Sequence, residues 1–388
     1  MDDNMKAFQK MMQEAVESAK SLWRHRKGME IPAAIQDTID ALFADRKPLL
    51  VNISRDEGWL LTFALPPGRS YAEFKKLEPY FADASGCAVQ IYKERKAVRV
   101  KVMTEDLGTS YPYKWDYAPY KEMALPFPVG YSPLGLLVRD FAEIVNLLVT
   151  GHPGAGKSAW LHMLITSLLL SRNVYVCIID RKKLEYQYLK DHALVVTSNK
   201  EATALLKALT REMDRRLKVL AGYNNFYTKL QEIPGYEATM PFVVLVIDEM
   251  AELEGYEAQE LLNRYVRLGR SPGMLCVGAT QRPSATMFES TSWSDSKAMF
   301  PGTLCFHVRD EINSRICLGN DRAAHIPNVP GRGIFQFDVE LEVQGMYLSP
   351  SQAIKLLNGQ GGSGPKGSGG SKGVVFDVGE SCKRLSPR

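Results

Sequence analysis

The sequence has few cysteines, six in 388 residues, and none of them forms a Cys-x-x-Cys pair. Four of the six lie within apolar runs typical of strands, and the six histidines lack the spacing of metal ligands. This pattern favours buried free thiols of a reducing compartment over disulfides or a zinc site.

The chain also lacks the run of about 18 apolar residues that a membrane-spanning helix requires. Its best apolar stretch, residues 159–170, is shorter than that and contains His162. Charges occur throughout the first thirty residues, which excludes a secretory signal there. We expect a cytoplasmic protein. The sequence leaves open a peripheral position at the inner face of the cell membrane, and a membrane segment outside this chain.

A large excess of charge of one sign is absent too, because the formal net charge is only +4. A basic field of the whole chain therefore does not predict nucleic-acid binding, and any basic surface must be local. Apolar residues make up 45% and charged residues 24%, which is typical of a globular protein with a substantial core. The length fits one large or two modest domains.

Hydrophobic patterning divides the chain into six segments. The longest of them alternates strands and helices, which predicts a mainly parallel sheet with helices on both faces. The segments are an N-terminal helical segment (1–46), a small α/β domain (47–110), a connector (111–133), the long α/β domain (134–356), a Gly/Ser-rich linker (357–373) and a tail peptide (374–388), which is either native or an addition.

Within the small domain we expect a helix over residues 71–81 with Ser70 as its N-cap. Alternating patterns predict a hairpin from residues 88–92 and 97–102. Strands of the long domain are expected at residues 146–150, 174–180, 242–248, 274–280 and 303–308, with a terminal pair at 333–338 and 341–348.

The most specific signal is GHPGAGKS at residues 151–158, which matches GxxxxGK[ST] and lies between an apolar strand and a helix. Glycines let backbone N–H groups surround phosphate oxygens, and the helix N-terminus adds its positive dipole end. Lys157 is expected to reach the β and γ phosphates of ATP, and Ser158 to hold Mg²⁺. The predicted nucleotide-binding residues are Gly151, Gly154, Ala155, Gly156, Lys157, Ser158 and Ala159.

Two acids end the buried strand at residues 242–248, namely Asp248 and the adjacent Glu249. After such a phosphate-binding loop, we expect Asp248 to order the Mg²⁺ shell and Glu249 to act as general base. The alternative is that these acids cap the next helix. Gln281 ends the next predicted strand, where it could contact the γ-phosphate or the attacking water; the alternative is a polar turn.

The motifs VIDE at residues 246–249 and ATQRPS at residues 279–284 resemble the FtsK/SpoIIIE family of double-stranded DNA translocases. Further similar segments follow the family order at residues 179–185, 212–216, 222–224 and 313–315. LPPGRSYAEF at residues 65–74, VPGRG at 329–333 and EVQ at 342–344 resemble the FtsK-type motors of conjugative plasmids and integrative elements.

This resemblance implies a RecA-like P-loop ATPase, preceded by the small α/β domain, that forms a hexameric ring and pumps double-stranded DNA in transfer of a mobile element. It implies no small-molecule substrate besides ATP, and it leaves open a membrane-embedded transfer or secretion complex as partner. Arg315 and Arg270 are candidates for an arginine that acts across a subunit boundary. A Thr-Arg pair of many members is replaced here by Gly302-Thr303. Only about fifteen residues follow the linker in this sequence, so we expect the winged-helix module of the division members to be missing.

Other functions stay open at this stage: a type VII-like protein-secretion ATPase, a viral genome-packaging ATPase, or an ATP-gated scaffold. Candidate DNA-facing segments are residues 181–183 and 289–297, and a solvated surface patch is an equally good interpretation of each.

Overall fold

The computed structural model describes residues 30–55, 58–94, 97–103, 107–133, 135–171, 174–183, 185–223, 226–236, 240–281 and 297–359. The chain forms two compact units, Met1–Leu107 (unit 1) and Gly108–Arg388 (unit 2). Most of the N-terminal helical segment, the tail peptide and the segment 282–296 lie outside the described residues.

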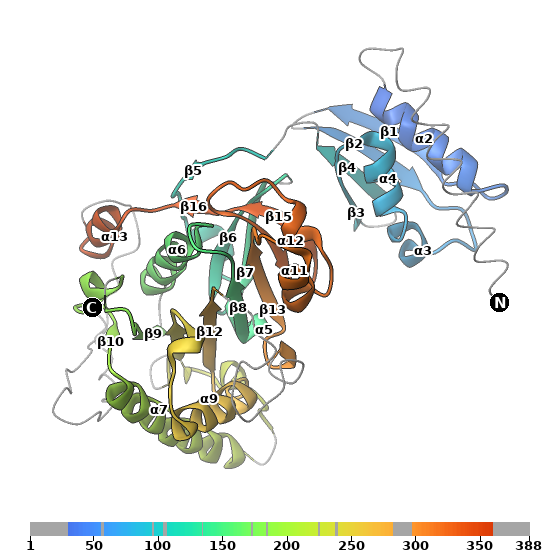
Figure 1. The fold of residues 1–388 in the computed structure, drawn as a ribbon. Helices are drawn as coiled ribbons and strands as arrows, with labels where there is room; N and C mark the ends of the chain where they lie inside the picture. The colour runs from blue at the N-terminus through green and yellow to red at the C-terminus, as the bar shows by residue number, and fades with distance from the viewer. Residues whose placement is uncertain are drawn as a thin grey trace. The chain divides into compact units, whose positions relative to one another are not determined.

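Unit 1 is a four-stranded antiparallel sheet with helices packed on one face (Figure 1). The strand order β1-β2-β4-β3 makes β4 a central strand, and β3 and β4 form the predicted hairpin. The elements are α2 (Glu30–Leu42), β1 (Leu49–Arg55), β2 (Trp59–Ala64), α3 (Tyr71–Lys75), α4 (Glu78–Ser85), β3 (Ala88–Glu94) and β4 (Ala97–Met103).

The single helix expected over residues 71–81 is two helices, and that expectation was wrong in this respect. Ser70 does cap α3, because its side chain accepts a hydrogen bond from the Glu73 N–H. Pro79 lies in the first turn of α4. A proline has no N–H to donate to the preceding turn, so the helix ends and restarts before it.

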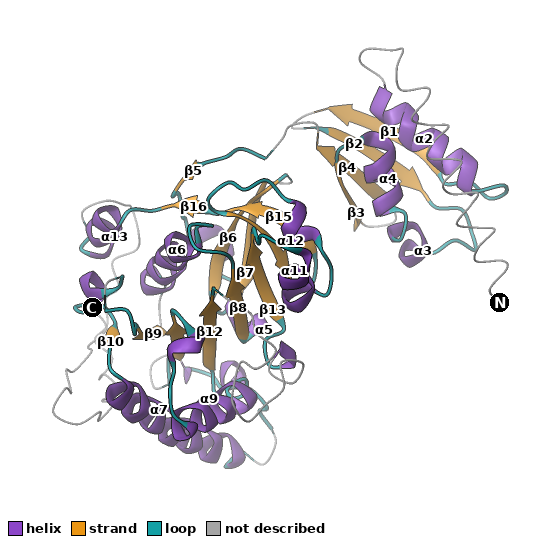
Figure 2. Cartoon of the chain, in the orientation of Figure 1, coloured by secondary structure: helices purple, strands orange, loops and turns teal. Residues whose placement is uncertain are grey.

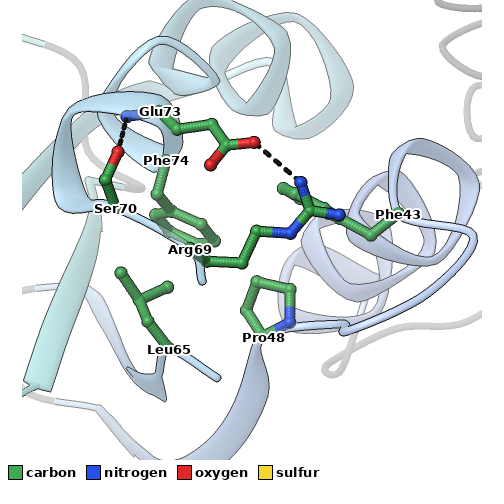
Figure 3. Close-up of a pocket in the computed structure, with 7 residues that line it drawn as sticks. All are labelled: Phe43, Pro48, Leu65, Arg69, Ser70, Glu73 and Phe74. Atoms are coloured by element: carbon green, nitrogen blue, oxygen red, sulfur yellow. Dashed lines mark hydrogen bonds and ion pairs between the residues drawn. The ribbon is translucent and has the colours of Figure 1, made fainter. Parts of the chain in front are cut away.

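Arg69 closes the corner between α3 and α2 (Figure 3). Its guanidinium lies 4.8 Å from the ring centre of Phe43 and donates to Glu73 Oε1 over 2.8 Å. The hollow that these side chains line with Phe74 has no space for a water molecule. It is therefore a packed corner with no room for a ligand.

Unit 2 contains a ten-stranded sheet in the order β10-β9-β11-β12-β8-β13-β14-β15-β6-β7. The first six strands of this order are parallel and the last four are antiparallel. The strands are β6 (Pro126–Ser132), β7 (Gly135–Asp140), β8 (Asn146–Thr150), β9 (Val174–Ile179), β10 (Leu194–Val196), β11 (Phe242–Ile247), β12 (Met274–Thr280), β13 (Gly302–Phe306), β14 (Arg332–Gln336) and β15 (Glu340–Gln344), with a separate pair of β5 (Tyr111–Pro112) and β16 (Met346–Tyr347).

Helices cover both faces of this sheet (Figure 2). One hydrophobic cluster joins the sheet to α6 (Lys157–Leu170) and α13 (Pro350–Leu357), and the other joins it to α7 (Asn199–Ala221) and α9 (Tyr256–Leu268). The remaining helices are α5 (Phe141–Ile144), α11 (Glu311–Leu318) and α12 (Arg322–His325), with short 3₁₀ turns η1 (Ala118–Tyr120), η2 (Gln187–Leu189), η3 (Leu230–Glu232) and η4 (Met250–Glu252).

The predicted α/β class with a large, mostly parallel sheet is confirmed. The interval expected to be a connector, residues 111–133, contains β5 and β6, and both pair with strands of unit 2. Within the described residues, no helix has both the length and the apolarity needed to cross a bilayer.

Candidate nucleotide-binding site

The phosphate-binding loop connects β8 to α6 through three glycines with positive φ angles: Gly151, Gly154 and Gly156. Gly156, at φ 101°, packs so tightly that an added Cβ would lie 2.3 Å from the Gly331 backbone nitrogen. Gly331 N–H in turn donates to the Ala155 carbonyl over 2.8 Å. Only glycine fits position 156, for its conformation and for its space.

The loop surrounds a cavity of about 170 Å³ at the N-terminus of α6. Backbone N–H groups at such an end have no partner within the helix, and they attract anions together with the helix dipole. The lining residues are His152, Pro153, Gly154, Gly156, Lys157, Ser158, Ala159 and Gln281. Five of the seven predicted nucleotide-binding residues thus line this cavity, whereas Gly151 and Ala155 do not.

Lys157 is only 5% exposed and lies beside the two acids that follow β11. Its Nζ donates to the Asp248 carbonyl over 2.6 Å, and lies 3.6 Å from Asp248 Oδ1 and 4.0 Å from Glu249 Oε2. β11 pairs with β12 in parallel register, and β12 with β8, so both loops end at the same edge of the sheet. The structure therefore brings the three residues together around one point.

Glu249 is fixed by its neighbours. Both of its carboxylate oxygens accept from the Gln281 backbone N–H at 3.2 Å, and Lys182 Nζ lies 3.9 Å from Oε2. Gln281 itself lines the cavity at the end of β12. The carboxylate is 8% exposed, which leaves it close to the cavity but shielded from bulk water.

Tyr186 is a site residue that the sequence did not reveal. Its hydroxyl donates to Asp248 Oδ1 over 3.2 Å, and its side chain is fully buried. Burial, reinforced by the nearby carboxylates of Asp248 and Glu185, holds the pKa of Tyr186 well above its usual value, so the hydroxyl keeps its proton. No local pattern marks this tyrosine, because only the fold brings residue 186 to the end of β11.

His162 lies on α6, one turn after Ser158, and its ring packs against the ring of Tyr186. The two rings are 4.9 Å apart. The other His162 contacts are Tyr188 Oη at 2.8 Å and Glu185 Oε2 at 3.3 Å. The hydrogen bond with His162 holds the pKa of Glu185 below its usual value. A buried polar cluster therefore connects the P-loop helix to Asp248.

The two candidate arginines do not line this cavity in their own chain. Arg315 lies on α11, about half exposed, and its guanidinium contacts Glu311 at 2.7 Å and Asp321 at 3.3 Å. Arg270 lies in the loop before β12, whose amino end is at the opposite edge of the sheet from the P-loop.

The candidate DNA-facing segments have mixed environments. Arg181 donates to the backbone carbonyls of Glu252 and Thr197, and Lys182 faces Glu249. Residues 289–296 lie outside the described part of the chain, as does Arg282. Lys297 is described, and burial lowers its pKa.

Comparisons with known proteins show what the region around this site is similar to. Residues 113–285 match the model of the FtsK/SpoIIIE family. The DNA translocase FtsK of Chlorobaculum tepidum is 34% identical over 218 residues, which is 50% of this chain and 26% of that protein. The DNA translocase FtsK of Lactiplantibacillus plantarum is 30% identical over 264 residues, 62% of this chain and 32% of that protein. The chain thus spans about a quarter to a third of these relatives.

Solved structures share the fold at lower identity. The pCW3 conjugation coupling protein TcpA, in its monomer form with ATPγS, matches with a TM-score of 0.56 and 23% identity, over 84% of this chain and 97% of that one. The cytoplasmic domain of the Thermomonospora curvata type VII secretion ATPase EccC matches with a TM-score of 0.52 and 22% identity, over 67% and 33%. With the phosphate-binding loop and the two acids in place, residues 113–285 of this chain are similar to the FtsK/SpoIIIE family.

Proposed function

We propose that this chain is a motor that hydrolyses ATP to move double-stranded DNA, in transfer of a mobile element. One observation carries the proposal: Lys157, Asp248 and Glu249 converge within 4.0 Å at the wall of the P-loop cavity. A lysine and two acids at a helix N-terminus are the groups that bind and cleave a triphosphate.

The cavity fits the phosphates of a nucleotide. Gly154 has φ 85°, and a side chain added there would meet no atom within 4 Å, so the loop is open on that side. Lys157 and the α6 dipole supply positive charge at its floor. Ser158 and Asp248 offer the oxygen ligands that Mg²⁺ prefers. The residues present therefore fit both ATP and Mg²⁺.

Each residue has one role in the proposal. Ser158 and Asp248 hold Mg²⁺, which neutralises charge on the phosphates when bound. Lys157 contacts the β and γ phosphates. Glu249 accepts the proton of the attacking water as general base, and its two bonds from the Gln281 N–H keep the carboxylate aimed. Gln281 contacts the γ-phosphate side of the cavity.

The proposal includes a ring of six copies around the duplex. The cavity is open, and an arginine from a neighbouring subunit would complete it. Arg315 is the better candidate of the two, because α11 follows β13, which runs parallel to β8 and ends at the same edge of the sheet as the P-loop. Arg270, at the opposite edge, would have to reach the site of a different neighbour.

DNA is the proposed substrate because the relatives at 30% identity and above are DNA translocases by name, and the TcpA likeness adds conjugation. The fold likeness to a type VII secretion ATPase favours protein secretion as the second candidate. An association of the ring with a membrane-embedded transfer complex belongs to this proposal as well.

Phosphate release by the purified chain tests the proposal, with and without long duplex DNA at low salt. We expect duplex DNA to stimulate turnover. Glu249→Gln should lower turnover about 100-fold or more while ATP binding is retained, since a general base contributes at least that much. Glu252→Gln is the matched control, because Glu252 is an exposed acid three residues away.

The outcomes separate the candidates. Stimulation by a secretion-signal peptide but not by DNA would favour the secretion ATPase. ATP binding without turnover in the wild-type chain would favour an ATP-gated scaffold. Equal turnover in Glu249→Gln and the wild type would remove the general-base role.

A further inference from the structure

An exposed lysine reaches the buried carboxylate of the proposed general base. Lys182 Nζ lies 3.9 Å from Glu249 Oε2, and the two side chains are 36% and 8% exposed. Among the described residues, Glu249 has the only carboxylate within 4.0 Å of this ammonium group. Lys182 does not line the nucleotide cavity. It therefore connects the protein surface to the catalytic carboxylate without occupying the space for ATP.

The sheet brings the turn after β9 to Glu249. Because β9 and β11 are parallel neighbours, the residues that follow them leave the same edge of the sheet. Lys183 has φ 62°, a left-handed conformation that is uncommon outside glycine, and its N–H donates to Oδ1 of the buried Asp180 over 3.0 Å. Such conformations are concentrated at functional sites. The backbone that carries Lys182 is thus fixed next to the site.

The side chains of Arg181 and Lys182 differ in how firmly they are held. The Arg181 guanidinium donates to the carbonyls of Thr197 and Glu252 over 3.0 and 3.2 Å. The Lys182 ammonium, on a flexible four-carbon stem, lies beyond hydrogen-bond distance of its carboxylate. A partly exposed ion pair of this kind is weak. A competing anion can therefore draw Lys182 away while Arg181 stays in place.

Glu249 Oε2 lies between two ammonium groups. Lys157 Nζ is 4.0 Å away and Lys182 Nζ is 3.9 Å away. In the proposed reaction Lys157 contacts the phosphates of ATP, which leaves Lys182 beside the carboxylate. A general base must come within hydrogen-bond reach of the proton that it accepts. An oxygen that faces an ammonium group is less available to the attacking water, so the Lys182 pair restrains the base.

We propose that Lys182 is a positioning residue that couples DNA binding to ATP hydrolysis. Without DNA, its ammonium group pairs with Glu249. A phosphate of the duplex draws that group away, and Oε2 then accepts the proton of the attacking water. Lysines bind DNA phosphates without sequence preference, so duplexes of any sequence should act alike. This inference rests on the proposed function, because it assigns the stimulation by DNA to one side chain.

Phosphate release by the full chain carrying Lys182→Gln, with and without saturating duplex DNA, tests the proposal. DNA-free turnover should rise about threefold to fivefold, which is the strength of a partly exposed ion pair expressed as a rate. Turnover with DNA should equal that of the wild type, so the stimulation ratio should fall by the same factor. The rise should be in kcat, with KM for ATP unchanged, because Lys182 does not line the cavity. Lys182→Arg keeps the charge and should retain the wild-type ratio.

The matched control is Lys207→Gln, because Lys207 pairs with Glu257 over 2.8 Å between α7 and α9 and neither residue lines the cavity. Both of its rates should stay at the wild-type values. An equal rise in the two variants, or a fall in the DNA-free turnover of Lys182→Gln, overturns the proposal. If DNA stimulates the wild type and Lys182→Gln to the same extent, the coupling role is refuted and the motor function stands. A wild type that DNA does not stimulate refutes both.

Discussion

Replacing Tyr186 by phenylalanine removes a buried hydroxyl that donates to Asp248 Oδ1 over 3.2 Å. The ring stays, so its packing against His162 is kept. The substitution removes the hydrogen bond to one oxygen of the Asp248 carboxylate, which we propose to hold Mg²⁺. We therefore expect a defect in the use of Mg²⁺ rather than a general loss of fold.

The size of the effect follows from the kind of bond. A hydrogen bond to a charged group contributes about 1.5–3 kcal/mol, and 1.4 kcal/mol is a factor of ten. Loss of a group that orients a metal ligand typically weakens metal affinity or activity about 10–100-fold. We expect Tyr186→Phe to need about 10-fold more Mg²⁺ for half-maximal binding of a fluorescent ATP analogue.

Tyr265→Phe is the matched control. Tyr265 is also fully buried, and its hydroxyl donates to the Leu275 carbonyl over 3.2 Å, far from any residue of the cavity wall. Both variants should lose similar stability, but only Tyr186→Phe should shift the Mg²⁺ titration. Nucleotide affinity in excess chelator should be the same in both. Identical Mg²⁺ curves for the two variants would refute a positioning role for Tyr186.

Two further changes probe the loop and the core. Gly156→Ala should abolish nucleotide binding in the same fluorescence titration. The added Cβ would collide with the Gly331 backbone, and a φ of 101° disfavours alanine. Unchanged nucleotide affinity would contradict this prediction. Glu212→Ala should lower the free energy of unfolding, measured in urea, by about 3 kcal/mol, because it removes the carboxylate that pairs with the buried Arg216 guanidinium. Burial raises the pKa of Glu212, but hydrogen bonds from Arg215 and Arg216 outweigh it and hold that pKa below its usual value. The pair's contribution should therefore be complete above about pH 5 and fall as pH drops through the folded pKa, so the wild type should lose more stability on acidification than Glu212→Ala does.

The sequence predicted the P-loop and the acids after β11 because their signals are local. A strand, a glycine-rich turn and a helix follow one another within residues 146–170, and no distant residue is needed to recognise them. The strand ends at residues 150, 247 and 280 differ by at most one residue from expectation, because each buried strand is bounded by polar or glycine residues.

The remaining features depend on contacts distant in sequence. Residues 126–132 lack strand alternation and include two prolines, yet they pair with β7 and with β15, which lies about 210 residues later in the chain. Tyr186 reaches Asp248 only because β9 and β11 are neighbours in the sheet. The contacts of Arg315 are the exception, because its partners Glu311 and Asp321 lie only four and six residues away.

The antiparallel strands of the sheet hold the P-loop in place together with the parallel strand β8. Gly331, just before β14, donates to Ala155 of the P-loop and accepts from the Gly345 N–H, both at 2.8 Å. Gly345 packs against Trp160 of α6, whose indole N–H donates to the Val129 carbonyl of β6. The P-loop and the first turn of its helix are therefore held from β6, β14 and β15, as well as by β8. A shift of the loop toward a bound phosphate would break these hydrogen bonds unless the strands moved with it, so the contacts favour a loop that is already in place before a nucleotide binds.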